Sequence, residues 1–226
     1  MRLALFDLDQ TLLDGDSDLE WSELLAEHGA QDAARTRAFH EQYHAGTLDI
    51  EAFFAFQLEP LARFPIATLL AWRERFVRER ILPLIREEAR VLVHDHRAMG
   101  HELVLITATN SFLTRPIADA FFIPHLVASE PEVVGGRFTG RLSGKPCFRE
   151  GKLSKLEGWL ARRGLRLDEL PASYFYSDSH NDLPLLARVT HPIAVDPDPV
   201  LGAHARERGW PIVELHARGS RSLSAG

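Results

Sequence analysis

The chain has 226 residues and a formal net charge of −6, with 45% hydrophobic and 26% charged residues. This composition is typical of a globular protein with a sizeable core, and the negative charge argues against nucleic acid or an anionic membrane as partner. No apolar run approaches a transmembrane span, and Asp7 and Asp9 interrupt the amino terminus before a signal-peptide core could form. Cys147 is the only cysteine, so we expect no intramolecular disulfide and a reducing, cytoplasmic setting.

The first expected element is a short apolar run, residues 3–6, that leads directly into two carboxylates, Asp7 and Asp9. A continuous apolar run is typical of a strand buried on both faces of a parallel sheet. Neighbouring carboxylates repel each other, and their burial without a partner is unfavourable. A hard cation such as Mg²⁺ takes oxygen ligands and removes this repulsion. The pattern predicts a carboxylate metal site at the carboxyl end of a strand; the alternative is a solvated acidic turn.

Residues 15–83 have helical periodicity with no strand among them. After an acidic, turn-rich linker, apolar residues recur at helical spacing in four stretches, about 21–28, 32–44, 50–58 and 67–80, and Pro83 closes the last one. Four consecutive helices predict a small helical bundle, inserted between the first strand and the rest of the chain.

Strands and helices alternate in the remainder. The expected helices cover 86–99, 111–122, 150–163, 183–188 and 200–208, and the expected strands cover 102–107, 125–129, 173–177, 193–195 and 212–215. Gly135 and Gly136 indicate a hairpin over 133–138. The alternation predicts an α/β fold with a Rossmann-like, doubly wound parallel sheet. We expect a core of 1–14 and 84–216, an inserted domain of 15–83, and a flexible tail of 217–226.

Four pieces of the chain, in order, resemble the motifs of the haloacid dehalogenase (HAD) superfamily of phosphohydrolases. Residues 7–11 match its first motif, DxDx[TV], and Thr107, at the end of the second strand, matches the second. Lys152 opens a helix as the third motif requires, and residues 177–182 resemble the fourth, in its [GS]DSxxD form. The helical insertion corresponds to a type C1 cap, and the chain is most similar to the phosphoserine-phosphatase-like branch, subfamily IB.

The resemblance implies a Mg²⁺-dependent phosphomonoester hydrolase that acts through an aspartyl-phosphate. Asp7 would attack phosphorus, and Asp9 would protonate the leaving alkoxide and then activate water. Thr107 and the backbone at Ala108 would bind phosphoryl oxygens, and Lys152 would neutralise their charge. Two other lysines remain alternatives for this last role, Lys145 and Lys155.

The same resemblance implies a set of metal ligands. Mg²⁺ would be held by Asp7, the backbone carbonyl of Asp9 and Asp178, with Asp182 nearby. Supporting hydrogen bonds would come from Thr11, Asn110 and Asn181.

Substrate specificity is expected in the cap. Asp16 occupies the position at which phosphoserine phosphatases carry a Glu for the substrate amine, and Asp18 is close by. Gln57 stands where they carry an Arg for the substrate carboxylate, which removes a bidentate contact. The expected partner is a small amine-bearing phosphate ester, such as histidinol phosphate or a phosphoserine-like compound. A lipid phosphate such as phosphatidylglycerophosphate, a phosphomutase reaction, or a merely solvated acidic turn at Asp16 and Asp18 remain alternatives.

Two other classes deserve comparison. His40-Glu41-x-x-His44 matches the H-E-x-x-H signature of zinc metallopeptidases on an expected helix, but the extended signature needs Gly where Thr47 stands, and no third ligand is evident. Phosphorylated receiver modules also combine an Asp, a metal site, a Thr and a Lys, but their acceptor Asp ends a middle strand and they carry no cap. The sequence favours neither class.

Overall fold

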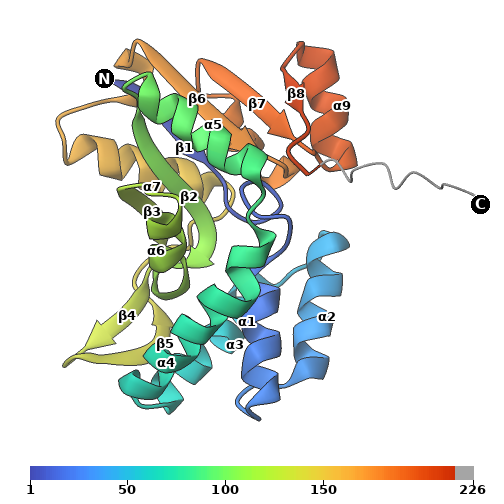
Figure 1. The fold of residues 1–226 in the computed structure, drawn as a ribbon, viewed down its shortest axis with the longest axis vertical. Helices are drawn as coiled ribbons and strands as arrows, with labels where there is room; N and C mark the ends of the chain where they lie inside the picture. The colour runs from blue at the N-terminus through green and yellow to red at the C-terminus, as the bar shows by residue number, and fades with distance from the viewer. Residues whose placement is uncertain (217–226) are drawn as a thin grey trace, which may run out of the picture.

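A six-stranded parallel sheet, in the order β3-β2-β1-β6-β7-β8, forms the centre of the computed structural model, which describes residues 1–216 (Figure 1). Every neighbouring pair in the sheet is parallel. The predicted doubly wound sheet is confirmed, whereas the tail predicted for 217–226 lies outside the described residues. The strands are β1 (Arg2–Phe6), β2 (Glu102–Asn110), β3 (His125–Ser129), β6 (Ala172–Ser177), β7 (His191–Val195) and β8 (Ile212–Val213).

Helices cover both faces of this sheet. On one face lie α5 (Glu87–Ala98) and α6 (Ser111–Ala120), and on the other lie α7 (Glu150–Ala161), α8 (Leu183–Leu186) and α9 (Pro199–Arg208). In β1, Ala4 and Phe6 belong to the first apolar core and Leu3 and Leu5 to the second. Because successive strand residues point to opposite faces, both layers require apolar residues, which explains the unbroken apolar run.

The four predicted consecutive helices lie beyond the carboxyl ends of the strands (Figure 1). They are α1 (Ser17–Glu27), α2 (Ala33–His44), α3 (Ile50–Arg63) and α4 (Ile66–Phe76). The carboxylates of Asp16, Asp32 and Asp49 accept backbone N–H groups at the starts of α1, α2 and α3, which satisfies donors that have no partner inside the helix. The assignment of 15–83 to a separate cap domain stays a prediction.

The fourth helix differs from the expected single helix over 67–80. Regular α4 ends at Phe76, and the chain continues as a π-helical turn (Val77–Ile81) and a 3₁₀ turn (Leu82–Leu84). Pro83 explains the change, because in a continued α-helix its ring would clash with the carbonyl group four residues earlier. The returning chain then runs beside the outgoing linker, where the Asp14 N–H donates to the Leu84 carbonyl at 2.9 Å.

The predicted hairpin is present as β4 (Pro131–Val134) and β5 (Arg137–Leu142), paired antiparallel. Gly135 and Gly136 both have positive φ, as a tight type I′ turn requires. The β5 strand packs against α3, and a Cβ atom on Gly140 would lie only 3.3 Å from the Ala62 Cβ. Two single 3₁₀ turns, η3 (Leu167–Glu169) and η4 (His180–Asp182), complete the elements. Among residues 1–216, no helix is both long and apolar enough to cross a bilayer.

Candidate active site

A cavity of about 460 Å³ lies between the carboxyl ends of the strands and the helices α1, α2 and α3. Of the residues singled out in the sequence, it brings together Asp7, Asp9, Asp16, Asp18, Gln57, Thr107, Ala108, Lys152, Asp178, Asn181 and Asp182. Thr11 and Asn110 do not line it. Residues that are up to 175 positions apart in the chain, such as Asp7 and Asp182, therefore meet at the edge of the sheet where parallel α/β folds bind ligands.

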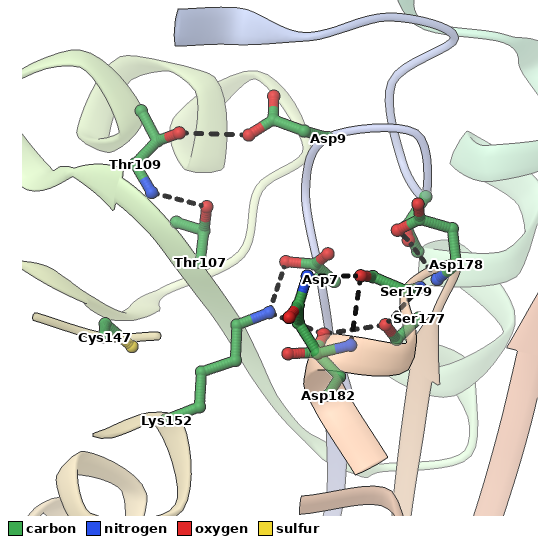
Figure 2. Close-up of polar contacts among 12 residues, drawn as sticks. Asp7, Asp9, Thr107, Thr109, Cys147, Lys152, Ser177, Asp178, Ser179 and Asp182 are labelled. Carbon is green, nitrogen blue, oxygen red and sulfur yellow. Dashed lines mark hydrogen bonds and ion pairs between the residues drawn. The ribbon is translucent and has the colours of Figure 1, made fainter. Parts of the chain in front are cut away.

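Lys152 joins the ends of three segments. Its Nζ donates to Asp7 Oδ1 at 2.8 Å and to Asp182 Oδ2 at 2.6 Å (Figure 2). Lys152 enters from the first turn of α7, Asp7 follows β1, and Asp182 ends the turn after β6. Of the three lysines considered in the sequence, Lys145 is exposed and Lys155 half-buried, so only Lys152 is placed to meet the carboxylates.

The protonation states of Lys152 and of its neighbouring carboxylates depend on each other. Burial raises the pKa of Asp7 to about 7, the Lys152 ammonium acts against this, and the charge of Asp182 adds to it. Burial alone would lower the pKa of Lys152, but Asp182 and Asp7 hold it above its ordinary value. Lys152 therefore stays charged and supplies one positive charge to two carboxylates.

Asp178 adds a further carboxylate without a cation. Its Oδ1 accepts the Thr11 hydroxyl at 3.0 Å, and its own N–H donates back to the Thr11 Oγ1 at 3.0 Å. Burial, followed by the charges of Asp7 and Asp182, raises the pKa of Asp178 well above its usual range, and no lysine, arginine or histidine of residues 1–216 forms an ion pair with it. Uncompensated hard oxygen donors fit a divalent cation such as Mg²⁺, which is usually held by one or two carboxylates together with water and phosphate.

Asp9 points away from Lys152 (Figure 2). Its Oδ1 accepts the Ser17 N–H at 2.6 Å and its Oδ2 lies 3.0 Å from the Thr109 hydroxyl oxygen. Burial raises the pKa of Asp9 to about 7, with a further contribution from Asp16. A carboxyl group with this pKa can hold or release a proton near neutral pH, which suits general acid–base chemistry.

Thr107 lies in an irregular part of β2. The strand continues to Asn110 instead of ending at residue 107 as predicted, but its pairing with β3 shifts register between Ile106 and Asn110. Within this bulge the Thr107 Oγ1 accepts the Thr109 N–H at 3.1 Å, and Thr107 and Ala108 line the cavity. Bulges redirect side chains beside active sites, and here the bulge turns three consecutive residues toward the cavity.

The residues predicted to support the site have separate positions. The Asn110 side chain accepts the Leu113 N–H at 3.2 Å and so caps α6. Asn181 is buried, and its Nδ2 donates to the Ser179 Oγ at 3.2 Å inside the turn that carries Asp178 and Asp182. Thr11 acts on Asp178 from outside the cavity. The hydrogen bonds connect Thr11 and Asn181, but not Asn110, to the carboxylate turn.

Asp16 and Asp18, the acidic residues expected to recognise the substrate, lie on the side of the cavity that holds Asp9 and Thr109. Asp16 Oδ1 accepts the Leu19 N–H at 2.9 Å, and Asp18 Oδ2 lies 2.8 Å from the Thr109 hydroxyl oxygen. Gln57 is buried, and its Oε1 accepts the Ser22 hydroxyl at 3.2 Å. The second oxygen of Asp18 is buried with no hydrogen-bond partner among residues 1–216, and burial raises the pKa of Asp18 well above its usual range. The Asp18 carboxylate therefore lacks one hydrogen-bond donor.

An apolar wall of the cavity was not anticipated from the sequence. It consists of side chains from α2, from α3 and from the loop between them: Phe39, Leu48, Ile50, Phe53, Phe54 and Phe56. The spacing of α3 had indicated a buried helix face, but periodicity does not say whether that face meets other side chains or a ligand. Tyr43 from α2 also lines the cavity and accepts the Asn181 Nδ2–H at 3.5 Å.

The metallopeptidase alternative gains no support. His40 lines the cavity, and Glu41 is exposed. The side chain of His44 is outside the described part of the structure. Within that part, no three or more His, Cys, Asp or Glu side chains form a cluster that could hold a metal by themselves.

Comparison with known proteins agrees with the geometry. Residues 4–187 match the model of the haloacid dehalogenase-like hydrolase family. A protein of Neisseria meningitidis named histidinol-phosphatase is 43% identical over 219 residues, which cover 95% of this chain and 99% of that protein. Phosphoserine phosphatase SerB1 of Mycobacterium tuberculosis is 33% identical over 224 residues, covering 92% of this chain and 69% of that protein.

Solved structures with the same fold are also found. A Bordetella pertussis protein of unknown function superimposes with a TM-score of 0.89 at 48% identity, covering 95% of this chain and 98% of that one. A substrate-bound phosphoserine phosphatase shares the fold with a TM-score of 0.68 at 18% identity, covering 94% and 92%. With the family model spanning most of the chain, the protein belongs to the haloacid dehalogenase-like hydrolases and is a phosphatase of that family.

Proposed function

We propose that the protein is a Mg²⁺-dependent phosphomonoester hydrolase in which Asp7 forms a covalent aspartyl-phosphate. The observation that carries this proposal is the position of Lys152 between Asp7 and Asp182, with the carboxyl of Asp9 turned away toward Thr109. The two carboxylates that follow β1 therefore have different partners, as two different chemical roles require.

Each group has a definite task in the first half of the reaction. Lys152 fixes one oxygen of Asp7, which leaves the other oxygen to attack phosphorus in line with the departing alkoxide. Asp9, oriented by the Ser17 N–H and the Thr109 hydroxyl, donates its proton to that alkoxide. Thr107 and the Ala108 N–H bind the phosphoryl oxygens, and the Lys152 ammonium balances their charge.

In the second half, water replaces the alcohol. Asp9 has lost its proton and takes one from the water that attacks the aspartyl-phosphate, so that phosphate is released and Asp7 is regenerated. Asp7, Asp178 and the backbone carbonyl of Asp9 would hold Mg²⁺, and Asp182 acts through Lys152. When bound, the ion offsets the repulsion between the carboxylates and the phosphate and stabilises negative charge on the phosphoryl oxygens.

The cavity also favours a particular substrate. Among its described lining residues, Lys152 is the only lysine or arginine, so a carboxylate on the substrate would find no guanidinium partner. Asp16 and the unpaired oxygen of Asp18 favour a protonated amine, and the phenylalanines of α2 and α3 favour an apolar or aromatic group. We therefore propose an amine-bearing phosphate ester without a carboxylate. Histidinol phosphate meets these requirements, and the Neisseria relative carries the corresponding name.

Phosphate release from a panel of esters tests the proposal. The panel contains histidinol phosphate, phosphoserine, a nucleoside monophosphate, phosphatidylglycerophosphate and p-nitrophenyl phosphate, each with Mg²⁺ and with EDTA. We expect Mg²⁺-dependent release with preference for histidinol phosphate. A preference for phosphoserine would contradict the role given to Gln57, and phosphoryl transfer without release of inorganic phosphate would indicate a mutase.

Asp18→Asn tests the amine site separately. A desolvated charge-assisted hydrogen bond contributes about 1.5–3 kcal/mol, which corresponds to roughly tenfold or more in kcat/KM. We expect this loss for histidinol phosphate relative to p-nitrophenyl phosphate, which has no amine. Glu23→Gln, an exposed position on the same helix outside the cavity, is the matched control. Equal losses for both esters would remove Asp18 from amine recognition.

A further inference from the structure

Arg149 has a backbone conformation that normally requires glycine. It precedes α7 with φ 51° and ψ −123°, in the left-handed half of the conformational map where a Cβ atom is strained. The turn around it is tight, since the Gly151 N–H donates to the Phe148 carbonyl at 2.9 Å and a Cβ atom on Gly151 would lie 2.1 Å from the Pro146 carbonyl oxygen. Strain of this kind persists only where the surroundings enforce it, and it is found at functional sites.

The side chain of Arg149 reaches the carboxylate turn from the start of α7. Its Nε donates to the Asn181 Oδ1 at 2.9 Å, and its guanidinium lies over the Phe148 ring, 5.0 Å from the centroid. The buried Asn181 amide in turn donates to the Ser179 Oγ at 3.2 Å. The guanidinium therefore links the first turn of α7 to the segment that carries Asp178 and Asp182.

Lys152 follows Arg149 by three residues and depends on the same turn. The Lys152 N–H donates to the Arg149 carbonyl at 3.0 Å, so the strained residue and the buried lysine share one backbone unit. Lys152 must reach Asp7 and Asp182 together, at 2.8 and 2.6 Å. A small rotation of the first turn of α7 would lengthen at least one of these contacts, because the two carboxylates belong to different segments.

We propose that Arg149 is a positioning residue: it holds the first turn of α7 against the 177–182 turn, and so keeps the Lys152 ammonium between Asp7 and Asp182. This inference rests on the proposed role of Lys152 in the phosphatase reaction. Glycine at position 149 would fit the backbone better but would carry no guanidinium. The backbone conformation at position 149 therefore favours glycine, whereas the contact with Asn181 requires arginine. A substitution can separate the effect on stability from the effect on catalysis.

Arg149→Gly provides the test. It removes the strain and the link together, so we expect a melting temperature equal to or above that of the wild type and a kcat about tenfold lower with Mg²⁺ and the best ester of the panel. Added ethylguanidinium should restore part of the lost rate, because it can occupy the vacated position beside Asn181. It should not restore a variant lacking Lys152, such as Lys152→Met.

Phe122→Gly is the matched control. Phe122 also has positive φ, 55°, but it is 74% exposed after α6 and does not line the cavity. We expect relief of strain there with an unchanged kcat. Two results would overturn the inference about Arg149 and leave the proposed function standing. One is a wild-type kcat in Arg149→Gly, and the other is a fall in kcat with a lower melting temperature and no rescue. No phosphate release by the wild-type protein on any ester would overturn the proposed function and this inference with it.

Discussion

Removal of the buried lysine should affect stability and catalysis by separable amounts. In Lys152→Met, the carboxylates of Asp7 and Asp182 lose contacts of 2.8 and 2.6 Å at a position that is 3% exposed. Breaking a buried ion pair by removal of one partner costs about 3–5 kcal/mol. We expect a loss of this size in the free energy of unfolding of the metal-free protein, measured by urea denaturation.

Catalysis should fall more than the loss of stability explains. A preorganised donor to phosphoryl or developing oxyanion charge contributes roughly 10²–10³ in kcat, so phosphate release by folded Lys152→Met should be lower by about that factor. In Lys152→Met/Asp182→Asn, one of the two unpaired charges is gone. This double variant should regain much of the stability and none of the rate.

The stability loss should also depend on pH. Lys152 holds down the pKa of Asp7, so its removal raises that pKa further above the unfolded value of 3.8. The folded variant then binds more protons than the unfolded chain, and its stability increases as the pH falls. The gap between wild type and Lys152→Met should therefore be wide at about pH 8 and narrow at about pH 5.

Lys155→Met is the control, since Lys155 is half-buried one turn further along α7. Surface substitutions of this kind change stability by about 0.5 kcal/mol or less. If Lys152→Met unfolded within about 1 kcal/mol of the wild type at every pH and kept its rate, the reasoning about the buried charge group would be refuted.

Three other outcomes follow from the same structure. Asp9→Asn should leave the fold intact and reduce turnover by roughly 10²–10⁴, visible in single-turnover release of both alcohol and phosphate; loss of only one product's rate would contradict its double role. Asp178→Asn should raise the melting temperature of the metal-free protein, since it removes a buried carboxylate without a cation, and should abolish the upward shift that Mg²⁺ gives the wild type; an unchanged Mg²⁺ shift would exclude Asp178 as a ligand. Buried His96, whose Nδ1 lies 2.7 Å from that of His101, has its pKa lowered to about 4 by burial; its contribution to stability is present above the unfolded value of about 6.5 and disappears toward pH 4. The free energy of unfolding of the wild type, measured by urea denaturation, should therefore fall over this range by about 3 kcal/mol more than that of His96→Gln, and parallel curves would refute the assignment.

Much of the fold was predictable because local and global signals agree. The apolar run of β1 required two covered faces, the helical spacing of apolar residues indicated α1 to α4, and Gly135 and Gly136 fixed the hairpin. The pitch change after Phe76 was not predicted. Hydrophobic spacing hardly differs between an α-helix and one π turn, so only the location of Pro83 hinted at an irregularity.

The site was predictable where a motif named the residue and less so where three-dimensional contacts decide. Lys152 could not be separated from Lys145 and Lys155 by sequence alone, and only the direction of α7 brings one of them to Asp7. Thr109 was overlooked, because its contacts with Asp9 and Asp18 arise from a bulge in β2 that no local sequence pattern predicts.

For two other residues, the contacts seen in the structure gave a role that the sequence did not predict. Asn110 was expected to support the site, but its side chain caps α6, a task that Asn performs wherever a helix begins. Arg149 had no sequence signal at all, because strain depends on backbone angles that a residue name does not reveal.

The covalent intermediate is the most direct test of the central claim. The protein would be mixed with Mg²⁺ and the best ester of the panel carrying ³²P, quenched in acid during turnover, reduced with borohydride and mapped by peptide mass spectrometry. We predict acid-stable, alkali-labile label on the wild type, homoserine at position 7 after reduction, and no label on Asp7→Asn. Turnover with no labelled protein, or label on a residue other than Asp7, would contradict the account.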